Sequence, residues 1–325
     1  RAFDRFIDME GKSDGEIAEL MRKLEIDIAV DLMGHTRNSR PGIFAQRPVP
    51  IQVSYLGYLG TMGADYIDYV IADKIVLPFD QDAYYSEKII HLPHCFLVND
   101  DTLAIGPHTP SRSDVGLPDE GFVFCSFNNS YKLAPAIFDL WMRLLRGVEG
   151  SVLWLVKANS EMAVNLQRAA QSCGVDPGRI VFAPHVPLAE HMARARLADL
   201  FLDTAPYNAG ATAAAALWSG VPVLTLLGNT FVGRMAASML HAVGLPELVA
   251  ESLADYEAVA LKIATEPEFC ASLKQKLARN RETYPLFDTA GSARDIENAY
   301  VTMWQACQDR RPPASFAVPA RSRAT

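Results

Sequence analysis

From residue 121 onward, short runs of β-branched and aromatic residues alternate with longer stretches in which apolar residues recur every three or four positions. The first pattern predicts buried strands and the second predicts amphipathic helices. The helices are expected to begin near Ala134, Glu161, Leu188 and Ala211, and the strands to cover residues 122–127, 152–156, 180–183, 200–203 and 221–226. Such alternation is typical of a parallel sheet covered by helices, so this part predicts a doubly wound α/β domain.

The first 110 residues show the later part of a similar unit. Ser13 and Glu16 have the spacing of a capping box, which predicts a helix that runs through Leu24. An apolar strand is expected over residues 26–32, and a shorter one over residues 51–55. These elements predict that residues 1–110 belong to another α/β domain.

Two polar segments divide the chain. Residues 107–120 contain three prolines with several Ser, Asp and Gly residues, and they predict a linker over residues 111–120. The second domain is then expected to cover residues 121–287, and a closing helix to cover residues 288–307. Residues 308–325 contain three prolines and four arginines with little to bury, which predicts a disordered tail.

The composition narrows the possible partners. The chain has 325 residues, of which 50% are hydrophobic and 21% are charged, which suits one large or two medium globular domains and argues against a fibrous, collagen-like or disordered protein. With 38 acidic against 30 basic residues the net charge is −8, so no global positive field exists. Nucleic acid and anionic membrane surfaces are therefore not expected as partners.

Five cysteines, an odd number without a C-x-x-C pair, fit reduced thiols better than a disulfide framework or a zinc site. The longest apolar stretch, residues 211–227, is interrupted by Ser219, Gly220 and Pro222, so it does not predict a membrane span. Residues 1–12 lack the basic start and apolar core of a signal peptide. These features predict a cytoplasmic location, and the missing initiator methionine predicts a piece of a longer protein.

Ligands of an open parallel sheet bind beyond the carboxyl ends of the strands, so the loops at those ends carry most of the candidate chemistry. The loop after strand 122–127 is Asn128-Asn129-Ser130-Tyr131-Lys132. A lysine at this place can neutralise a phosphate as a point charge. On spacing alone, a solvated loop lysine is the more common alternative.

The loop after strand 200–203 is rich in small residues and leads into an alanine-rich helix that begins at Ala211. Small residues let a ligand approach the backbone, and the first free N–H groups of the helix form a seat for an anion such as a diphosphate. A tight turn against a closely packed helix is the alternative explanation. Neither a P-loop nor a G-x-G-x-x-G occurs, so the ATP and dinucleotide fingerprints are absent.

Two weaker signals concern possible metal ligands. His185 and His191 follow strand 180–183, but such a pair is more often structural than catalytic, and no H-x-x-x-H or H-E-x-x-H spacing supports a metal. Asp80 and Asp82 form a D-x-D pair in a polar loop between weak strand signals. A metal site is the less favoured explanation of both features, so none is predicted.

Sequence blocks in both halves of the chain resemble one known family, in the same order. The blocks are residues 31–36 (DLMGHT), 44–53 (FAQRPVPIQV), 56–58, 60–63, 68–69, 124–128 (FCSFN), 131–132, 153–155, 179–180, 191, 202–204 (LDT), 217–218, 220–223 (GVPV) and 234–238 (RMAAS). Over roughly residues 3 to 305, the chain resembles the catalytic region of the O-linked N-acetylglucosamine transferase and SPINDLY family.

The resemblance implies a GT-B architecture, in which two Rossmann-like domains face a cleft that holds a nucleotide sugar. It also implies that the first domain is truncated at its amino end, and that an absent amino-terminal array of helical (TPR) repeats presents the protein acceptors. The implied donor is UDP-N-acetylglucosamine, transferred with inversion to Ser or Thr without a metal or cofactor. SPINDLY-type members imply GDP-fucose instead, and a related branch glucosylates asparagine.

The same resemblance assigns site residues in the second domain. Lys132 resembles the lysine that binds the donor diphosphate, and it is therefore the expected catalytic residue. Asn129 stands where the family has Gln or Asn. His191 resembles the histidine near the uracil, with Val186 and Leu188 lining the base by backbone contact.

The match also contains departures. Gly210-Ala211-Thr212 stands where the family has His-Thr-Thr gripping the diphosphate, and only Thr212 is kept. Ala215 stands where an aspartate normally binds the ribose. Lost polar groups at a nucleotide site cost about 1 to 3 kcal/mol each. A degenerate nucleotide-binding scaffold without catalysis is therefore the second hypothesis for this chain.

Features of the first domain leave two questions open. His35 follows a strand end, where it either faces the cleft as a general base or has a structural role. Gly57, Gly60 and Gly63 predict a loop whose backbone lies close to other atoms, either of a substrate or of the protein. Contact with a substrate and tight packing explain these glycines equally well.

Overall fold

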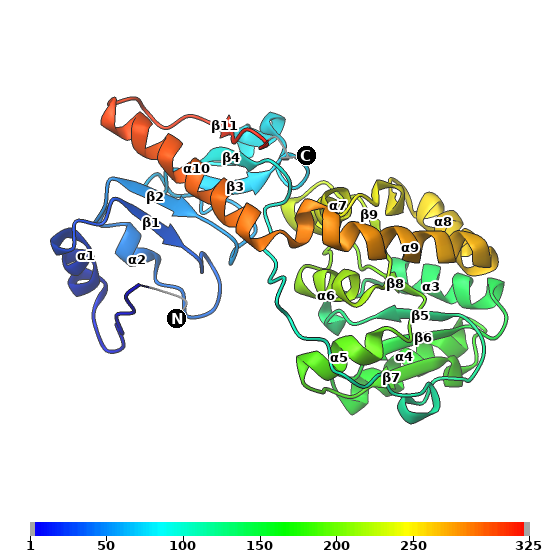
Figure 1. Ribbon diagram of the computed structural model, residues 1–325. Helices are drawn as coiled ribbons and strands as arrows, with labels where there is room; N and C mark the ends of the chain where they lie inside the picture. The colour runs from blue at the N-terminus through cyan, green and yellow to red at the C-terminus, as the bar shows by residue number, and fades with distance from the viewer. Residues whose placement is uncertain (1–3, 322–325) are drawn as a thin grey trace. The chain divides into compact units, whose positions relative to one another are not determined.

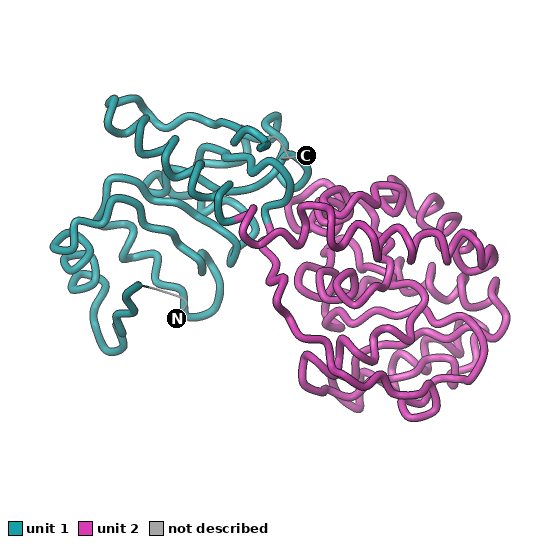
Figure 2. The backbone as a smooth tube through the Cα atoms, in the orientation of Figure 1, with its two compact units in different colours: residues 1–96, 293–325 teal, residues 97–292 magenta. Residues whose placement is uncertain are grey.

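The computed structural model describes residues 4–321, and the chain divides into two compact units (Figure 2). The first unit combines residues 1–96 with residues 293–325, and the second consists of residues 97–292. Each unit is built on its own parallel β-sheet, as the alternation of strands and helices predicts.

The first unit has a five-stranded parallel sheet in the order β1-β2-β3-β4-β11 (Figure 1). Its strands are β1 (Ile28–Asp31), β2 (Ile51–Ser54), β3 (Tyr69–Asp73), β4 (Lys88–Leu92) and β11 (Phe316–Ala317). Its other elements are α1 (Asp14–Lys23), α2 (Pro41–Phe44) and η1 (Phe79–Tyr84). The closing helix α10 (Thr289–Gln308) begins in the second unit, and its residues from 293 onward belong to the first. The predicted capping box of Ser13 and Glu16 is present at the start of α1.

The tail that was predicted to be disordered is ordered as far as residue 321. β11 extends the sheet beside β4, and the N–H of Ile89 donates to Ser315 Oγ at 2.9 Å. The N–H of Val318 donates to His91 O at 2.8 Å. The prediction was wrong because backbone pairing at a sheet edge holds this segment, and composition does not record that pairing. Residues 322–325 lie outside the described residues.

The second unit has a six-stranded parallel sheet in the order β10-β9-β8-β5-β6-β7. Its strands are β5 (Val123–Ser126), β6 (Val152–Val156), β7 (Ile180–Ala183), β8 (Leu200–Leu202), β9 (Val223–Leu226) and β10 (Val249–Ala250). Five of them lie where the sequence predicts strands, and β10 adds a sixth. The strand order reverses between β5 and β8, which is the arrangement of a doubly wound fold.

Seven α-helices accompany the described part of this sheet: α3 (Pro135–Gly147), α4 (Ser160–Ser172), α5 (Leu188–Ala195), α6 (Ala211–Ser219), α7 (Met235–Ala242), α8 (Leu253–Thr265) and α9 (Pro267–Thr283). The predicted starts of α5 and α6 are confirmed. Trp141 on α3 is 1% exposed, which confirms that its apolar stripe belongs to the core. No disulfide joins any of the five cysteines, all of which lie within the described residues. Within residues 4–321, no helix combines the length and apolarity needed to cross a membrane.

The segment predicted as a linker, residues 111–120, belongs to the second unit. The units divide after Phe96, earlier than the sequence predicts. The N–H of Gly106 donates to a carbonyl of α5 at 2.8 Å, and Arg112 pairs with Asp199 at 3.5 Å. These contacts attach the segment to its own unit, and proline and small polar residues do not distinguish such a packed segment from a free linker.

Candidate functional site

Loops at the carboxyl ends of β5 and β8 form the centre of the candidate site. The two strands are parallel neighbours, with Phe124 opposite Leu200, so their carboxyl ends lie at the same edge of the sheet. β5 is followed by the 3₁₀ turn η3 (Ser130–Lys132), and β8 is followed by the loop that leads into α6. The fold therefore brings to one edge the predicted residues Lys132, Gly210, Ala211 and Thr212.

Lys132 is a half-buried cation at the centre of this edge. Its Nζ donates a 2.9 Å hydrogen bond to Asn208 O and lies 4.1 Å from the centroid of the Tyr207 ring. Within the described part of the chain, no carboxylate forms an ion pair with it. Burial lowers the pKa of Lys132, and the negative charge of Asp203 opposes this effect. The ammonium thus keeps hydrogen-bonding capacity for an anion.

Asp203, the residue after β8, is fully buried and holds the loop that Lys132 contacts. Its Oδ1 accepts from the N–H groups of Thr204 at 2.8 Å and Ala209 at 2.7 Å. Its Oδ2 accepts from the Thr225 hydroxyl at 2.7 Å. Burial raises the pKa of Asp203 to about 6, although these hydrogen bonds oppose the rise. One carboxylate therefore fixes both ends of the loop.

Asn128, the second residue after β5, connects the two strand ends to α6. Its Nδ2 donates to Asp203 Oδ1 at 3.1 Å and to Thr204 Oγ1 at 2.7 Å. Its Oδ1 accepts from the hydroxyl of Thr212 in the first turn of α6. Gly210 precedes α6 and provides no side-chain cap, so the first N–H groups of this helix keep their capacity for an anion.

Two residues of α6 offer little polar chemistry. Ala211 is exposed and Ala215 is half-buried, and both side chains are methyl groups. The carbonyl of Ala215 accepts from the Ser219 hydroxyl at 2.7 Å within the helix. The first turns of α6 therefore offer backbone donors and the oxygen of Thr212, without a carboxylate.

His191 on α5 lies close to the same edge. Its ring packs edge-on against Phe127, the residue after β5, with the centroids 4.7 Å apart. Its Nδ1 accepts from Arg194, at 3.3 Å from Nε and 3.2 Å from Nη2, so the proton of the neutral ring is on Nε2. Burial, together with the charges of Arg194 and His185, lowers the pKa of His191 to about 4. The ring is therefore neutral near pH 7.

The remaining predicted residues of this unit surround these groups. Val186 is half-buried in the loop after β7, and Leu188, the first residue of α5, is 51% exposed. Asn129 is exposed, and its carbonyl accepts from the N–H of Lys132 at 3.0 Å. Phe127 links the His191 segment to the turn that carries Lys132, so the predicted base and diphosphate residues lie on neighbouring loops.

Candidate chemistry in the first unit is less concentrated. Asp80 and Asp82 lie in η1, and among residues 4–321 no group of three or more His, Cys, Asp or Glu side chains is placed to hold a metal ion. The exposed His35 bonds through Nε2 to Met62 O at 3.0 Å. When it donates this bond, the other ring nitrogen of the neutral ring is an acceptor.

Tight packing explains one of the three glycines in this unit. A methyl group added at Gly57 would lie 1.8 Å from the carbonyl oxygen of Leu32, the first residue after β1. At Gly60 the nearest neighbour would be the Tyr58 ring, at 3.3 Å. Gly63 has φ of +62°, a left-handed conformation that favours glycine. Backbone packing at Gly57 and the left-handed conformation at Gly63 therefore account for these two glycines without a substrate.

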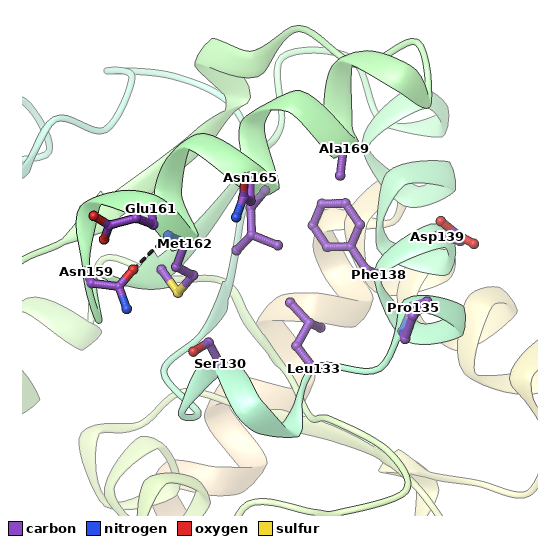
Figure 3. Close-up of a pocket in the computed structure, with 11 residues that line it drawn as sticks. Ser130, Leu133, Pro135, Phe138, Asp139, Asn159, Glu161, Met162, Asn165 and Ala169 are labelled. Atoms are coloured by element: carbon purple, nitrogen blue, oxygen red, sulfur yellow. Dashed lines mark hydrogen bonds between the residues drawn. The ribbon is translucent and has the colours of Figure 1, made fainter.

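A separate cavity of about 590 Å³ lies between α3 and α4 (Figure 3). Leu133, Phe138 and Met162 give it an apolar lining, and polar side chains surround them. Asn159 caps α4 by accepting from the N–H of Met162 at 2.7 Å. The cavity shares Ser130 with the η3 turn, but none of the predicted donor-binding residues lines it. It is therefore distinct from the candidate site.

Sequence reasoning did not select five residues that shape the site: Asn128, Arg194, Asp203, Tyr207 and Asn208. Two of them had a usable signal, because Asn128 and Asp203 are polar residues that follow buried strands. The other three have no distinctive spacing, since their contacts depend on how the loops meet in the folded protein.

Comparisons with known proteins identify the family and the fold of the chain. The model of glycosyl transferase family 41 matches residues 1–109 and 104–296. A protein of Arabidopsis thaliana described as a probable UDP-N-acetylglucosamine peptide N-acetylglucosaminyltransferase SEC is 39% identical over 323 residues, covering 97% of this chain and 33% of the relative. A probable SPINDLY transferase of Oryza sativa subsp. japonica is 33% identical over 313 residues, covering 94% of this chain and 33% of the relative.

A solved structure of an O-GlcNAc transferase also matches this chain. An O-GlcNAc transferase mutant from Thermobaculum terrenum superimposes with a TM-score of 0.84 at 31% identity, covering 94% of this chain and 58% of that one. This match confirms the predicted GT-B architecture with two parallel-sheet α/β domains. The chain spans about one third of the length of the two curated relatives. On these matches, the chain belongs to glycosyl transferase family 41.

Proposed function

We propose that this chain is the catalytic region of a transferase that moves N-acetylglucosamine from UDP-N-acetylglucosamine to Ser or Thr hydroxyls of proteins. One observation carries the proposal: the Lys132 ammonium, 2.9 Å from Asn208 O, contacts the loop that leads into α6 and has no acidic partner in the described residues. The donor and the peptide acceptor are taken from the names of the relatives.

The proposed reaction is a single displacement with inversion. The acceptor hydroxyl oxygen attacks the anomeric carbon on the face opposite the diphosphate, so the new C–O bond forms as the bond to the diphosphate oxygen breaks. The electron pair leaves with UDP, and the hydroxyl proton passes to a base or to solvent. Negative charge develops on the diphosphate, and groups aimed at that charge lower the barrier. In this proposal, Lys132 and the first N–H groups of α6 supply this stabilisation, without a metal or cofactor.

The second loop supports a subsite for the uracil base. His191 is neutral near pH 7, so its ring presents an uncharged face and an Nε2–H donor to an uncharged base. Val186 and Leu188 supply backbone groups beside it in this proposal. Asn129, Thr212 and the small residues Gly210 and Ala211 then lie toward the diphosphate.

The acceptor is proposed to be presented from outside this chain. The curated relatives are about three times as long as the chain, which leaves room for the array of helical repeats that the family resemblance implies. Protein acceptors and a nucleotide sugar are therefore the proposed partners.

Ala211 and Ala215 favour a second candidate function, a nucleotide-binding scaffold without catalysis. The two functions are separated by Ala215→Asp. If the ribose contact is missing from the natural chain, the new carboxylate strengthens UDP binding by about 5- to 100-fold. If the affinity barely changes, the ribose contact is made elsewhere and the scaffold hypothesis loses its main support.

A panel of donors tests the proposed reaction. The chain is incubated with UDP-N-acetylglucosamine, UDP-glucose or GDP-fucose and a library of Ser/Thr peptides, and both the released nucleotide and the modified peptide are measured. We expect UDP release with peptide modification from the first donor only. Exclusive use of GDP-fucose would assign the SPINDLY-type alternative. No transfer from any donor, by a folded chain that binds UDP, would support the scaffold.

A further inference from the structure

The surroundings of the Lys132 ammonium are unusual because an aromatic ring occupies the position where a counter-ion would be expected. Nζ lies 4.1 Å from the centroid of the Tyr207 ring and donates at 2.9 Å to the carbonyl of the next residue, Asn208. One N–H is therefore used by a carbonyl, and a second is directed at the ring face. An ammonium has three N–H groups, so one remains for a ligand oxygen.

The ring is itself held in place. The carbonyl of Tyr207 accepts from the Thr204 hydroxyl at 2.7 Å, and Thr204 is held by Asn128 and Asp203. On its outer side, Tyr207 meets the exposed Tyr131 edge-on, with the ring centroids 6.4 Å apart. The backbone of Tyr207 is thus anchored to the buried network, while its half-buried side chain covers the lysine.

A ring face attracts a cation, and the attraction grows as water is excluded. Burial at this place favours the neutral amine, whereas the ring and the charge of Asp203 favour the ammonium. Asp203 is the charged side chain that acts on Lys132 within the described residues, and its carboxylate is already bonded to four donors. Beside the carbonyl of Asn208, the ring is therefore the side chain that stabilises the charge without neutralising it.

We propose that Tyr207 is a positioning residue for Lys132: its ring holds the lysine charged and directs its remaining N–H toward the ligand. A carboxylate in the same position would also keep the lysine charged, but it would compete with a diphosphate for the cation and repel it. An aromatic ring avoids both effects. This inference rests on the proposed function, because it assigns the ligand as the diphosphate of a nucleotide.

The test changes the electrostatics of the ring and keeps its shape. The full chain is prepared with Tyr207→Phe and with Tyr207→pentafluorophenylalanine, whose ring face repels cations. UDP affinity is measured by calorimetry from about pH 6 to about pH 9.5, because burial lowers the pKa of Lys132 from the ordinary lysine value. Tyr84→Phe in η1 is the matched control, because Tyr84 is 77% exposed and lies in the first unit.

A second readout does not depend on a nucleotide. Lysines are reductively ¹³C-methylated, and the signal that is absent from a Lys132→Arg variant is followed by NMR across the same pH range. We expect Tyr207→Phe to resemble the natural protein in both readouts. In Tyr207→pentafluorophenylalanine, UDP binding is expected to weaken by about 3- to 30-fold, and the pKa of Lys132 to fall by about 0.4 to 1.5 pH units.

The inference is overturned if the two ring variants have the same Lys132 titration and the same UDP affinity. It is also overturned if both weaken binding equally, because the phenol hydroxyl would then be the important group. If the natural chain binds neither UDP nor GDP but the NMR shift between the variants is seen, the positioning role stands and the proposed function fails.

Discussion

The side chains of Asn128 and Asp203 are joined by a 3.1 Å hydrogen bond between the ends of the two central strands of the second unit. The same amide group also bonds to Thr204 and Thr212, so it ties β5 to the loop after β8 and to the first turn of α6. Asn128 is 7% exposed and Asp203 is fully buried. The proposed diphosphate seat is thus assembled by a buried amide and a buried carboxylate that lie beneath it.

Asn128→Ala removes all three of these hydrogen bonds and leaves Asp203 with one donor fewer. Because a buried acceptor that loses a partner costs about 1 to 3 kcal/mol, we expect the free energy of unfolding to fall by that amount. Urea unfolding measures the change. Asn298→Ala, at an exposed position on α10, is the control and is expected to change stability by less than about 0.5 kcal/mol. Equal effects of the two variants would show that the network does not hold the loop.

The pH dependence of stability tests the environment of Asp203. Its pKa in the folded protein, about 6, lies above the ordinary value of 3.8, so the folded state binds the proton more tightly than the unfolded chain. Ionisation of this group therefore lowers stability as the pH rises from about 4 to about 6. Asp203→Asn keeps the shape and cannot ionise. We expect the natural protein to lose stability relative to this variant over that interval, whereas a constant difference in urea unfolding contradicts the assignment.

The titration of His191 is expected to change stability with pH in the opposite direction to that of Asp203. Its pKa in the folded protein, about 4, lies below the ordinary 6.5, so the unfolded chain binds more protons between these values. Stability due to the neutral ring is therefore lost as the pH falls from about 6.5 toward about 4. His191→Phe is expected to remove this dependence in urea unfolding. His108→Phe, at an exposed position, should retain it. A natural protein whose stability parallels that of His191→Phe at every pH would contradict a neutral, half-buried His191 ring.

Two glycines of the first unit should respond to alanine in opposite directions. At Gly57 the added methyl group would lie 1.8 Å from Leu32 O, so Gly57→Ala is expected to destabilise the protein by about 1 to 3 kcal/mol. Gly15 lies in α1, and the nearest atom to an added methyl group, in Gln46, is 3.8 Å away. Gly15→Ala is expected to stabilise by about 0.5 to 1 kcal/mol. Unfolding midpoints compare the two, and a harmless Gly57→Ala would reopen a substrate role for that loop.

Much of the fold of the second unit could be predicted because its strands are continuous apolar runs separated by helical patterns. β6 and β7 have the bounds that the sequence indicates. In the first unit, β3 (Tyr69–Asp73) and β4 (Lys88–Leu92) were not predicted, because a 3₁₀ turn and irregular loops stand where a crossover helix would mark the alternation. β11 has two residues, and such a strand exists only through its partner.

The candidate site was predicted in part for a similar reason. Lys132 lies in the loop after β5 and Thr212 in the first turn of the helix after β8, so the general rule for parallel sheets locates them without a structure. Tyr207 stands 75 positions from Lys132 in the sequence, and no local pattern indicates that its ring covers the ammonium. Arg194 is three residues from His191, but only its hydrogen bonds to Nδ1 in the folded protein show that it fixes the proton on the histidine ring. The periodicity of the chain therefore does not predict site chemistry that depends on contacts between loops.

The central claim is that Lys132 holds the diphosphate of a uridine nucleotide. Titration calorimetry of the chain with UDP and with GDP tests it, beside Lys132→Ala and the surface control Lys23→Ala, whose lysine pairs with Glu19 on α1. We expect saturable UDP binding that weakens by about 10- to 100-fold in Lys132→Ala and is unchanged in Lys23→Ala. UDP binding that Lys132→Ala retains in full, or no UDP binding by the folded natural chain, would contradict the account.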